Sequence, residues 1–273
     1  MYNSYTCHHD DAHSRKPIVQ EHRTIFGPSH RVVTIGNPSI PEFLSYYDYI
    51  QKQTLSSSYY ELISNTLALN LALSSIPREL QSMHKLLEVF NIVRCDSKVV
   101  AHLSRPKVLS KAEVSLCMKH RYALSLLLLD CNSDFGIILE DDANPTKYSV
   151  KLLEQIVSFA GSYDPSLPIF IDLSSGCNLN ISNIVDASYS TLNGGLYKPI
   201  LPSSRTTCAY LVNKQFAALF LTSFRDPVAP IDYELTFILE LLRRKKSDLI
   251  CLWHEPAVFI HGSKDGTLST LLT

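Results

Sequence analysis

The chain has 273 residues, of which 45% are hydrophobic, which is enough to bury the core of one large domain or of two small ones. Its formal net charge of -1 argues against nucleic acid as the main partner, because proteins that bind nucleic acid usually carry a strong basic excess. Glycine is scarce, at nine residues, and neither a G-x-G-x-x-G nor a G-x-x-x-x-G-K-[ST] motif occurs, so we expect neither a dinucleotide fold nor a P-loop.

The N-terminal third of the chain gives weak structural signals. We expect residues 1–30 to form a poorly ordered segment, because the His-rich start is polar, and residues 31–273 to form a single domain. A short strand is predicted at 32–35. One helix is predicted within 42–75, between two prolines, and a second helix follows the second proline, where apolar residues recur at three- and four-residue spacings. A strand that ends at Asp96 comes next.

Stronger signals begin at Ser110. Ser110 and Glu113 have the spacing of a capping box, which predicts that a helix begins here. Beyond this helix we expect strands at 135–139, in a stretch ending in Asp172, at 206–212 and in two apolar stretches near the C-terminus. We expect helices at 148–163, 213–224 and 229–246, and a loop-rich segment at 176–205. This alternation predicts an α/β fold with a mixed, mostly parallel sheet flanked by helices.

Seven cysteines are spread along the chain, and no two of them form a C-x-x-C pair. This pattern favours buried, reduced thiols over a disulfide framework or a zinc cluster. The first residues lack the apolar core of a secretory signal, and the apolar run around "YALSLLLLD" is shorter than the roughly 20 residues that a membrane span requires. We therefore expect a cytoplasmic protein, either soluble or peripheral to a membrane.

Three adjacent carboxylates, Glu140, Asp141 and Asp142, follow the strand predicted at 135–139. Ligands collect at the carboxyl ends of strands in such a sheet, and adjacent acids at the end of a buried strand repel one another unless a positive group lies between them. A divalent metal that carries phosphate oxygens would neutralise them, because Mg²⁺ and Mn²⁺ commonly join carboxylates to substrate phosphates. The alternative is a solvated acidic turn that caps the following helix.

Several stretches, in this order along the chain, resemble one known family. The motif "ILEDDA" is similar to the metal-site motif of glycosyltransferase family 25, the lipooligosaccharide and collagen galactosyltransferase family. "VRCDSK" and "LSKAEVSLCMKH" before it, and "TTCAYLVNKQFAALF" and "PIDYEL" after it, resemble four further family segments. The chain departs from the family at Ala112, at Lys119 and near its start, where "VVTIGNPSIPEFLSYYD" replaces a segment that usually carries nucleotide-binding arginines.

The resemblance implies a GT-A fold, which is Rossmann-like, with a nucleotide-sugar donor and Mn²⁺ or Mg²⁺ as cofactor. It assigns Asp142 to the metal, Glu140 to the metal or to the donor ribose, and Asp141 to the donor sugar. Asp96 and His120 lie in segments that match the family, and we expect both near the donor. For His120 the alternative is a core histidine with a satisfied hydrogen bond.

A C-terminal histidine completes the metal shell in the GT-A fold, and His261, at the end of an apolar strand, is the candidate. The alternative is a surface or partly buried histidine, and His254 is a rival ligand. An inverting transferase also needs a carboxylate as general base. Asp232 is the candidate base, with helix capping as its alternative role, and Asp172 is the rival base.

We therefore expect a metal-dependent glycosyltransferase that moves a hexose, such as galactose, from a UDP-sugar to a glycan or glycolipid acceptor with inversion. The missing arginines favour an alternative, a non-catalytic family member that binds a nucleotide sugar or glycan as an assembly partner. A Mg²⁺-dependent phosphohydrolase is a third interpretation. The basic run Arg243, Arg244, Lys245 and Lys246 ends a helix, where cations suit the helix dipole; peripheral contact with anionic lipid is the alternative.

Overall fold

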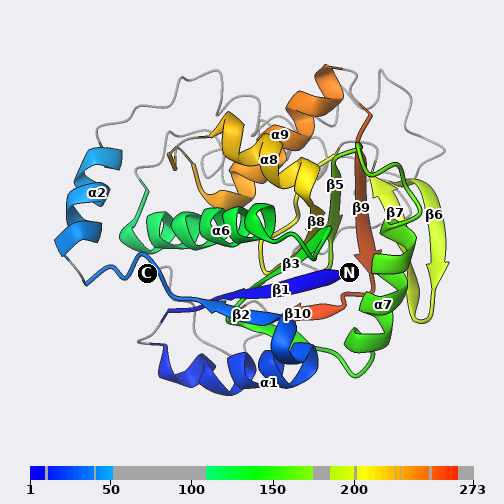
Figure 1. Cartoon of the computed structure of the whole chain (residues 1–273), viewed down its shortest axis with the longest axis horizontal. Helices are drawn as coiled ribbons and strands as arrows, with labels where there is room; N and C mark the ends of the chain where they lie inside the picture. The colour runs from blue at the N-terminus through cyan, green and yellow to red at the C-terminus, as the bar shows by residue number, and fades with distance from the viewer. Residues whose placement is uncertain are drawn as a thin grey trace, which may run out of the picture.

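The structure is a computed structural model that describes residues 1–9, 12–39, 41–51, 109–174, 185–199, 202–224, 226–227, 229–245 and 248–263. Within these ranges the chain forms a mixed α/β fold around a large central sheet with helices on both faces (Figure 1). The predicted architecture of a mixed sheet flanked by helices is thereby confirmed. Asp96, with the strand and the helix predicted before it, lies outside the described residues.

The central sheet of the described chain has the strand order β2-β1-β3-β8-β5-β9-β7-β6. The strands are β1 (Tyr2–Cys7), β2 (His30–Val33), β3 (Phe135–Glu140), β5 (Ile169–Asp172), β6 (Val185–Thr191), β7 (Gly194–Pro199), β8 (Ala209–Asn213) and β9 (Ile250–Glu255). β1 pairs in parallel with β2 and β3, β5 pairs in parallel with β9, and the remaining pairs are antiparallel. A second sheet pairs β4 (Ala143–Pro145) with β10 (Phe259–His261).

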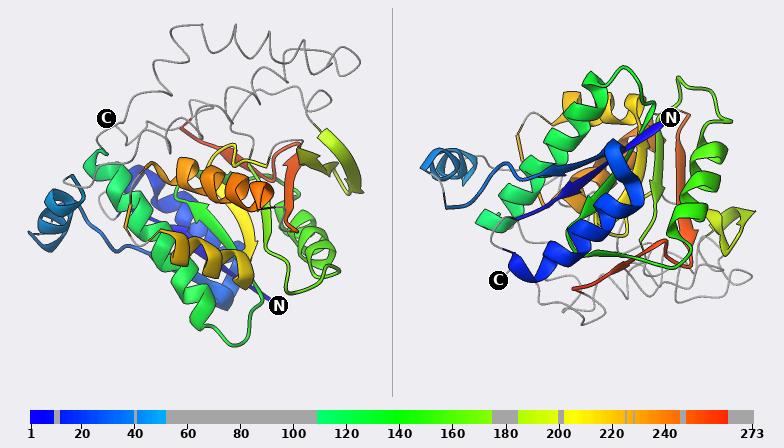
Figure 2. Two further views of the ribbon diagram at one scale, coloured as in Figure 1. Left: turned by 90° about the horizontal axis from the view of Figure 1, so that it is seen from above. Right: turned by 60° about the horizontal axis from the view of Figure 1, so that its bottom comes forward.

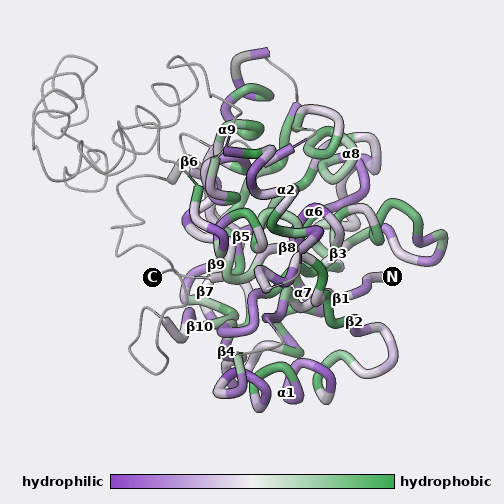
Figure 3. The backbone as a smooth tube through the Cα atoms, turned by 90° about the vertical axis from the view of Figure 1, so that its left-hand side faces the viewer, coloured by the Kyte–Doolittle hydropathy of each residue, from purple (hydrophilic) through white to green (hydrophobic). Residues whose placement is uncertain are grey.

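Helices cover both faces of the central sheet (Figure 2). Their bounds are α1 (Lys16–Phe26), α2 (Pro41–Gln51), α6 (Lys111–Leu129), α7 (Ser149–Ala160), α8 (Lys214–Ser223) and α9 (Ile231–Arg244). On one face, α6, α8 and α9 pack against Ile138 of β3; on the other, α1 and α7 pack against Ile137 and Leu139. Because β3 is buried on both faces, its sequence is a continuous apolar run, which Figure 3 shows as hydrophobic tube at the centre of the molecule.

The capping box predicted at Ser110 is confirmed. The Ser110 hydroxyl accepts a hydrogen bond from the Glu113 backbone amide (3.2 Å), and the Glu113 carboxylate accepts one from the Ser110 amide (2.8 Å). Two of the amides that a helix leaves unpaired at its start are thereby satisfied, so α6 begins at Lys111. This fixed start positions the first turns of α6 beside the ends of β1 and β3.

The prediction that residues 1–30 are poorly ordered is wrong, because β1 is an interior strand of the sheet and α1 covers it. Its side chains alternate: Tyr5 and Cys7 enter the apolar core, whereas Ser4 and Thr6 are buried against two histidines. All four hydrogen bonds of this polar face can form together when both histidines are neutral. Ser4 donates to His30 (2.9 Å), His30 to Thr6 (3.2 Å), Thr6 to His22 (2.9 Å) and His22 to the Ala143 carbonyl (2.7 Å). A strand that buries such hydrogen-bonded polar residues looks like a solvated tail in the sequence.

The expectation of a loop-rich segment at 176–205 is also wrong in part, because β6 and β7 form a hairpin at the edge of the sheet. The hairpin turns into β7 at Gly194, whose φ of 99° is a conformation that residues with a Cβ rarely adopt. A Cβ on Gly194 would lie 1.8 Å from the Glu255 carbonyl oxygen of β9. The glycine therefore allows β7 to approach β9 closely, and periodicity alone does not reveal this.

Candidate functional site

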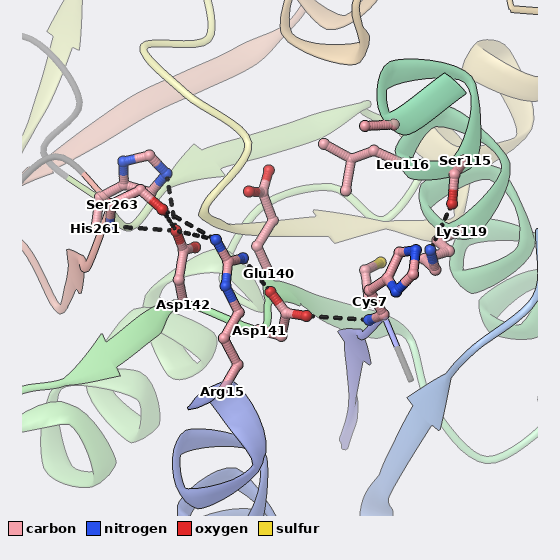
Figure 4. A pocket seen from close by; sticks show the side chains of 12 residues that line it. Cys7, Arg15, Ser115, Leu116, Lys119, Glu140, Asp141, Asp142, His261 and Ser263 are labelled. Atoms are coloured by element: carbon pink, nitrogen blue, oxygen red, sulfur yellow. Dashed lines mark hydrogen bonds and ion pairs between the residues drawn. The ribbon is translucent and has the colours of Figure 1, made fainter. Parts of the chain in front are cut away.

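A pocket lies where β1 and β3 end, at the carboxyl edge of the parallel part of the sheet. It has about 590 Å³ of empty volume, part of it open to solvent. Figure 4 shows α6 on one side, the residues that lead into α1 and those that follow β10 on the other, and the three acids between them. The lining residues are Cys7, His9, Arg15, Ala112, Ser115, Leu116, Lys119, Glu140, Asp141, Asp142, His261 and Ser263.

Asp141 holds the N-terminal segment against the end of β3. Its carboxylate accepts hydrogen bonds from His8 Nδ1 (2.9 Å), from the His9 backbone amide (3.0 Å) and from the Arg15 guanidinium. Burial alone would raise the pKa of Asp141, but the His8 hydrogen bond and the Arg15 charge hold it below its ordinary value. Because these contacts occupy both carboxylate oxygens, the predicted contact between Asp141 and a donor sugar finds no support in the geometry.

Arg15 is the positive group that lies between two of the acids. One of its guanidinium nitrogens contacts Asp141, and the other lies 3.7 Å from Asp142 Oδ2 and donates to the Ser263 hydroxyl (3.1 Å). Burial opposes its charge, but Asp141 and Asp142 outweigh burial and raise the pKa of Arg15. Sequence analysis missed this residue, because the segment "HHDDAHSRK" was interpreted as a flexible end.

Asp142 and His261 meet at one wall of the pocket. β10 pairs with β4 so that His261 lies opposite Ala143, and His261 Nε2 is 3.7 Å from Asp142 Oδ2. Ser263 binds the same oxygen through its hydroxyl and its backbone amide (3.3 Å). The other oxygen, Asp142 Oδ1, is buried and has no hydrogen-bond partner among the described residues. The predicted proximity of His261 and Asp142 is therefore confirmed, whereas metal binding by them stays a prediction.

Cys208 adds a third ligand type that the sequence prediction lacked. The ligand atoms of Asp142, Cys208 and His261 all lie within 4.8 Å of one another. Cys208 directly precedes β8, and its backbone carbonyl accepts a hydrogen bond from the Glu140 amide (2.8 Å), which fixes it beside the acids. Nothing in the local spacing of the cysteines indicates this, because the three ligands come from three distant segments.

Glu140 faces the pocket at the end of β3, supported by Thr207 and His120. The Thr207 hydroxyl donates to Glu140 Oε1, and His120 Nε2 lies 3.8 Å from the same oxygen. Burial and the neighbouring charge of Asp142 raise the pKa of Glu140 to about 8. Arg15 therefore does not fully neutralise the three acids in the described structure. A bound cation would lower the pKa of Glu140 again.

His120 lies behind Glu140 and does not line the pocket. It is completely buried, its Nδ1 is hydrogen-bonded to the Tyr210 hydroxyl (2.8 Å), and the two rings are stacked. Burial, with the charges of Lys119 and Arg121, lowers the pKa of His120 to about 3, so the ring is neutral. The geometry gives no support to the predicted donor contact, and the alternative of a core histidine fits in part, because Nδ1 is hydrogen-bonded whereas the buried Nε2 has no hydrogen-bond partner among the described residues.

Lys119, which departs from the family pattern, forms part of the opposite wall. Its side chain is 4% exposed and donates a hydrogen bond to the Ser115 hydroxyl (2.6 Å) one turn earlier on α6. Figure 4 shows these two side chains across the pocket from Asp142 and His261. Lysine ammonium and arginine guanidinium groups both bind phosphate oxygens, so Lys119 and Arg15 give the pocket two donors for an anionic ligand.

The two predicted bases do not line this pocket. Asp172 is completely buried and bonds Arg205 through the Arg205 side chain (3.2 Å) and backbone amide (2.9 Å). A carboxylate held in a buried ion pair cannot accept a proton from an acceptor hydroxyl without losing that pair, so Asp172 is structural. Asp232 lies in the first turn of α9, where its carboxylate accepts a hydrogen bond from the Tyr233 amide (3.0 Å), although the N-cap residue is Pro230 and not Asp232 as the capping alternative had it.

Neither the rival histidine nor the described residues of the basic run line the pocket. His254 is buried, donates from Nδ1 to the Pro256 carbonyl (2.7 Å) and is hydrogen-bonded through Nε2 to Thr191 (2.9 Å). In the basic run, Arg243 pairs with Glu240 on its own helix, and the Arg244 side chain and Lys246 lie outside the described residues. No helix in the described part of the chain is long and apolar enough to cross a lipid bilayer. Peripheral membrane contact stays a prediction.

The site thus combines metal-binding side chains with two buried cations at the edge of one pocket. This arrangement can hold a cation and an anionic ligand together, because Lys119 lies across the pocket from Asp142 and His261. No family model matches the chain, and no curated protein matches it.

Proposed function

We propose that this pocket binds a nucleoside diphosphate sugar through a divalent cation, and that the protein transfers the sugar to a glycan or glycolipid acceptor as a glycosyltransferase with a GT-A fold. The observation that carries the proposal is the meeting of Asp142 with His261 at the pocket wall. The resemblance to glycosyltransferase family 25 implies this pair as part of a metal shell. The order of the five similar motifs along the chain supports the same function.

The residues present fit a divalent cation. Asp142 Oδ1 is a buried acceptor without a hydrogen-bond partner among the described residues, and an imidazole nitrogen lies beside the same carboxylate. Carboxylate and imidazole ligands are typical of Mn²⁺, whereas Mg²⁺ prefers oxygen ligands. When bound, such a metal stabilises the negative charge that develops on a leaving diphosphate.

The protein's own residues would orient the donor. Lys119 and Arg15 are placed to donate to phosphate oxygens from opposite sides, while Asp141 holds Arg15 in position. Glu140 lies between them and remains the candidate for the ribose or the metal, as the resemblance implies. In this arrangement the N-terminal segment supplies charge to the site, which the family usually obtains from arginines in a different motif.

One observation favours the second candidate function, a non-catalytic protein that binds a nucleotide sugar. Transfer with inversion needs a carboxylate near the acceptor hydroxyl, and neither Asp172 nor Asp232 lines the pocket. The acids that do line it, in the described part of the chain, are Glu140, Asp141 and Asp142. If a base is present, one of these or a residue outside the described ranges has to serve.

Calorimetry with UDP and Mn²⁺ tests the proposal. We expect Asp142→Asn to weaken Mn²⁺-dependent UDP binding by at least roughly tenfold, because the loss of even an outer-shell partner of a metal ligand costs about 10- to 100-fold. Asp164→Asn, on an exposed turn, is the matched control and should bind like the wild type. Equal affinity in the wild type and in Asp142→Asn would remove Asp142 from the metal site. Donor binding without UDP-sugar turnover would favour the non-catalytic candidate.

A further inference from the structure

The position of Cys208 has a chemical consequence that the carboxylates and His261 do not share. Its side chain is completely buried, and its sulfur belongs to the group of three ligand atoms within 4.8 Å of one another. The antiparallel pairing of β8 with β3, together with the hydrogen bond from the Glu140 amide to the Cys208 carbonyl, holds this cysteine at the level of the acids. The sheet itself therefore brings a sulfur ligand beside Asp142 and His261.

Asp142 supplies an independent sign that this cluster takes a ligand. Its side chain is almost completely buried, and its Oδ1 has no hydrogen-bond partner within the described residues. A buried polar atom left without a partner costs free energy, and the cost is larger when the group is charged. A cation at this oxygen would remove that penalty.

The ligand types and their charges indicate which cation. A carboxylate, a thiolate and a neutral imidazole carry two negative charges in total, which balance one divalent cation. Such mixed oxygen, nitrogen and sulfur sets are typical of Zn²⁺ and related borderline metals, whereas Mg²⁺ binds oxygen ligands and retains water. We propose that Cys208 is a metal ligand and that this site selects Zn²⁺ or a similar borderline cation over Mg²⁺. This inference rests on the proposed function only in placing a metal at Asp142.

The distances allow this with small side-chain movements. Ligands about 2.0–2.3 Å from a tetrahedral metal lie roughly 3.3–3.8 Å from one another. One carboxylate oxygen of Asp142, the Cys208 sulfur and one ring nitrogen of His261 all lie within 4.8 Å of one another. Closure therefore requires a shift of up to roughly 1 Å, which rotation of a side chain supplies. On binding, the Cys208 S–H bond breaks, its proton passes to the buffer and the sulfur binds the metal.

Cobalt is the probe, because Co²⁺ replaces Zn²⁺ in such sites and reports its ligands by absorption. Chelator-treated full-length protein should give a near-ultraviolet thiolate-to-cobalt charge-transfer band when Co²⁺ is added, and Zn²⁺ should bleach it while Mg²⁺ in large excess should not. In Cys208→Ser the band should disappear, and Zn²⁺ affinity should fall by at least roughly tenfold. Cys251→Ser, at a buried cysteine of β9 outside the cluster, is the matched control and should keep the band.

A second measurement keeps the test decisive if Cys208→Ser does not fold. Calorimetry of Zn²⁺ binding to Glu140→Gln, in which Glu140 can release no proton, should show release of about one proton near neutral pH, from the thiol, in buffers of different ionisation enthalpy. A wild-type cobalt spectrum without a charge-transfer band, or a band retained in Cys208→Ser, would overturn the assignment. UDP binding with Mn²⁺ but no thiolate band would refute this inference alone, whereas the thiolate band without any nucleotide-sugar binding would refute the proposed function alone.

Discussion

Replacing Arg15 tests whether this side chain neutralises the acids at the end of β3. Arg15 is 6% exposed and contacts Asp141, Asp142 and Ser263. In Arg15→Gln the two carboxylates would stay buried with one fewer positive group, and breaking a buried ion pair by removing one partner typically costs about 3–5 kcal/mol. We therefore expect the free energy of unfolding to fall by about that amount. This is a large share of the ~5–15 kcal/mol of a typical domain.

Chemical denaturation at neutral pH, without divalent metal, is the assay. Arg31→Gln is the matched control: Arg31 is exposed on β2, and substitutions of exposed residues usually change stability by no more than about 0.5 kcal/mol. Zn²⁺ or Mn²⁺ should restore part of the stability that Arg15→Gln loses, because a cation at Asp142 supplies the missing charge. A loss below about 1 kcal/mol, comparable with that of the control, would refute the role of Arg15 as the neutralising group.

Three further predictions concern the surrounding fold. Burial, with the charges of His22 and Arg23, lowers the pKa of His30 to about 4, and burial lowers the pKa of His22. Below pH 6.5, the ordinary pKa of an unfolded histidine, the unfolded chain therefore binds more protons than the folded one, and stability should fall as the pH drops from about 6.5 towards 4, by up to roughly 1.4 kcal/mol per pH unit for each histidine. Denaturation at stepped pH should show a shallower slope in His30→Gln. Gly194→Ala should lower stability by about 1–3 kcal/mol in thermal unfolding, and more than Gly27→Ala, whose added Cβ meets no atom within 4 Å. Asp232→Asn should leave UDP affinity and turnover near those of the wild type and lower stability by no more than about 1 kcal/mol, and a large loss of turnover would restore it as the base.

Local sequence signals predicted the parts of the fold that local physics determines. The capping box at Ser110 and the apolar run of β3 are set by neighbours in the chain, and both were confirmed. The three acids were placed in one pocket because a strand end fixes their position, and the proximity of His261 was inferred only through the family resemblance.

The sequence could not reveal features that depend on distant partners. Ser4 and Thr6 make the sequence of β1 look polar and exposed. The histidines that accept their hydrogen bonds lie in α1 and β2, so the sequence does not show that these residues are buried. Asp172 resembles a base in the sequence because Arg205, which neutralises it, is far along the chain. Cys208 joins Asp142 and His261 only through the antiparallel pairing of β8 with β3, and no spacing rule encodes that pairing.

The interior position of β1 also affects how the chain acquires its structure during translation. Residues 2–7 emerge before their partner strand Phe135–Glu140, with which they pair residue by residue. At roughly 5–20 residues per second, a ribosome needs on the order of ten seconds to reach that partner. During this delay β2 is the only central-sheet neighbour of β1 already synthesised, and the hydroxyl groups of Ser4 and Thr6 keep one face of the waiting strand hydrophilic. The polarity that conceals this strand in the sequence is therefore also a protection against premature aggregation.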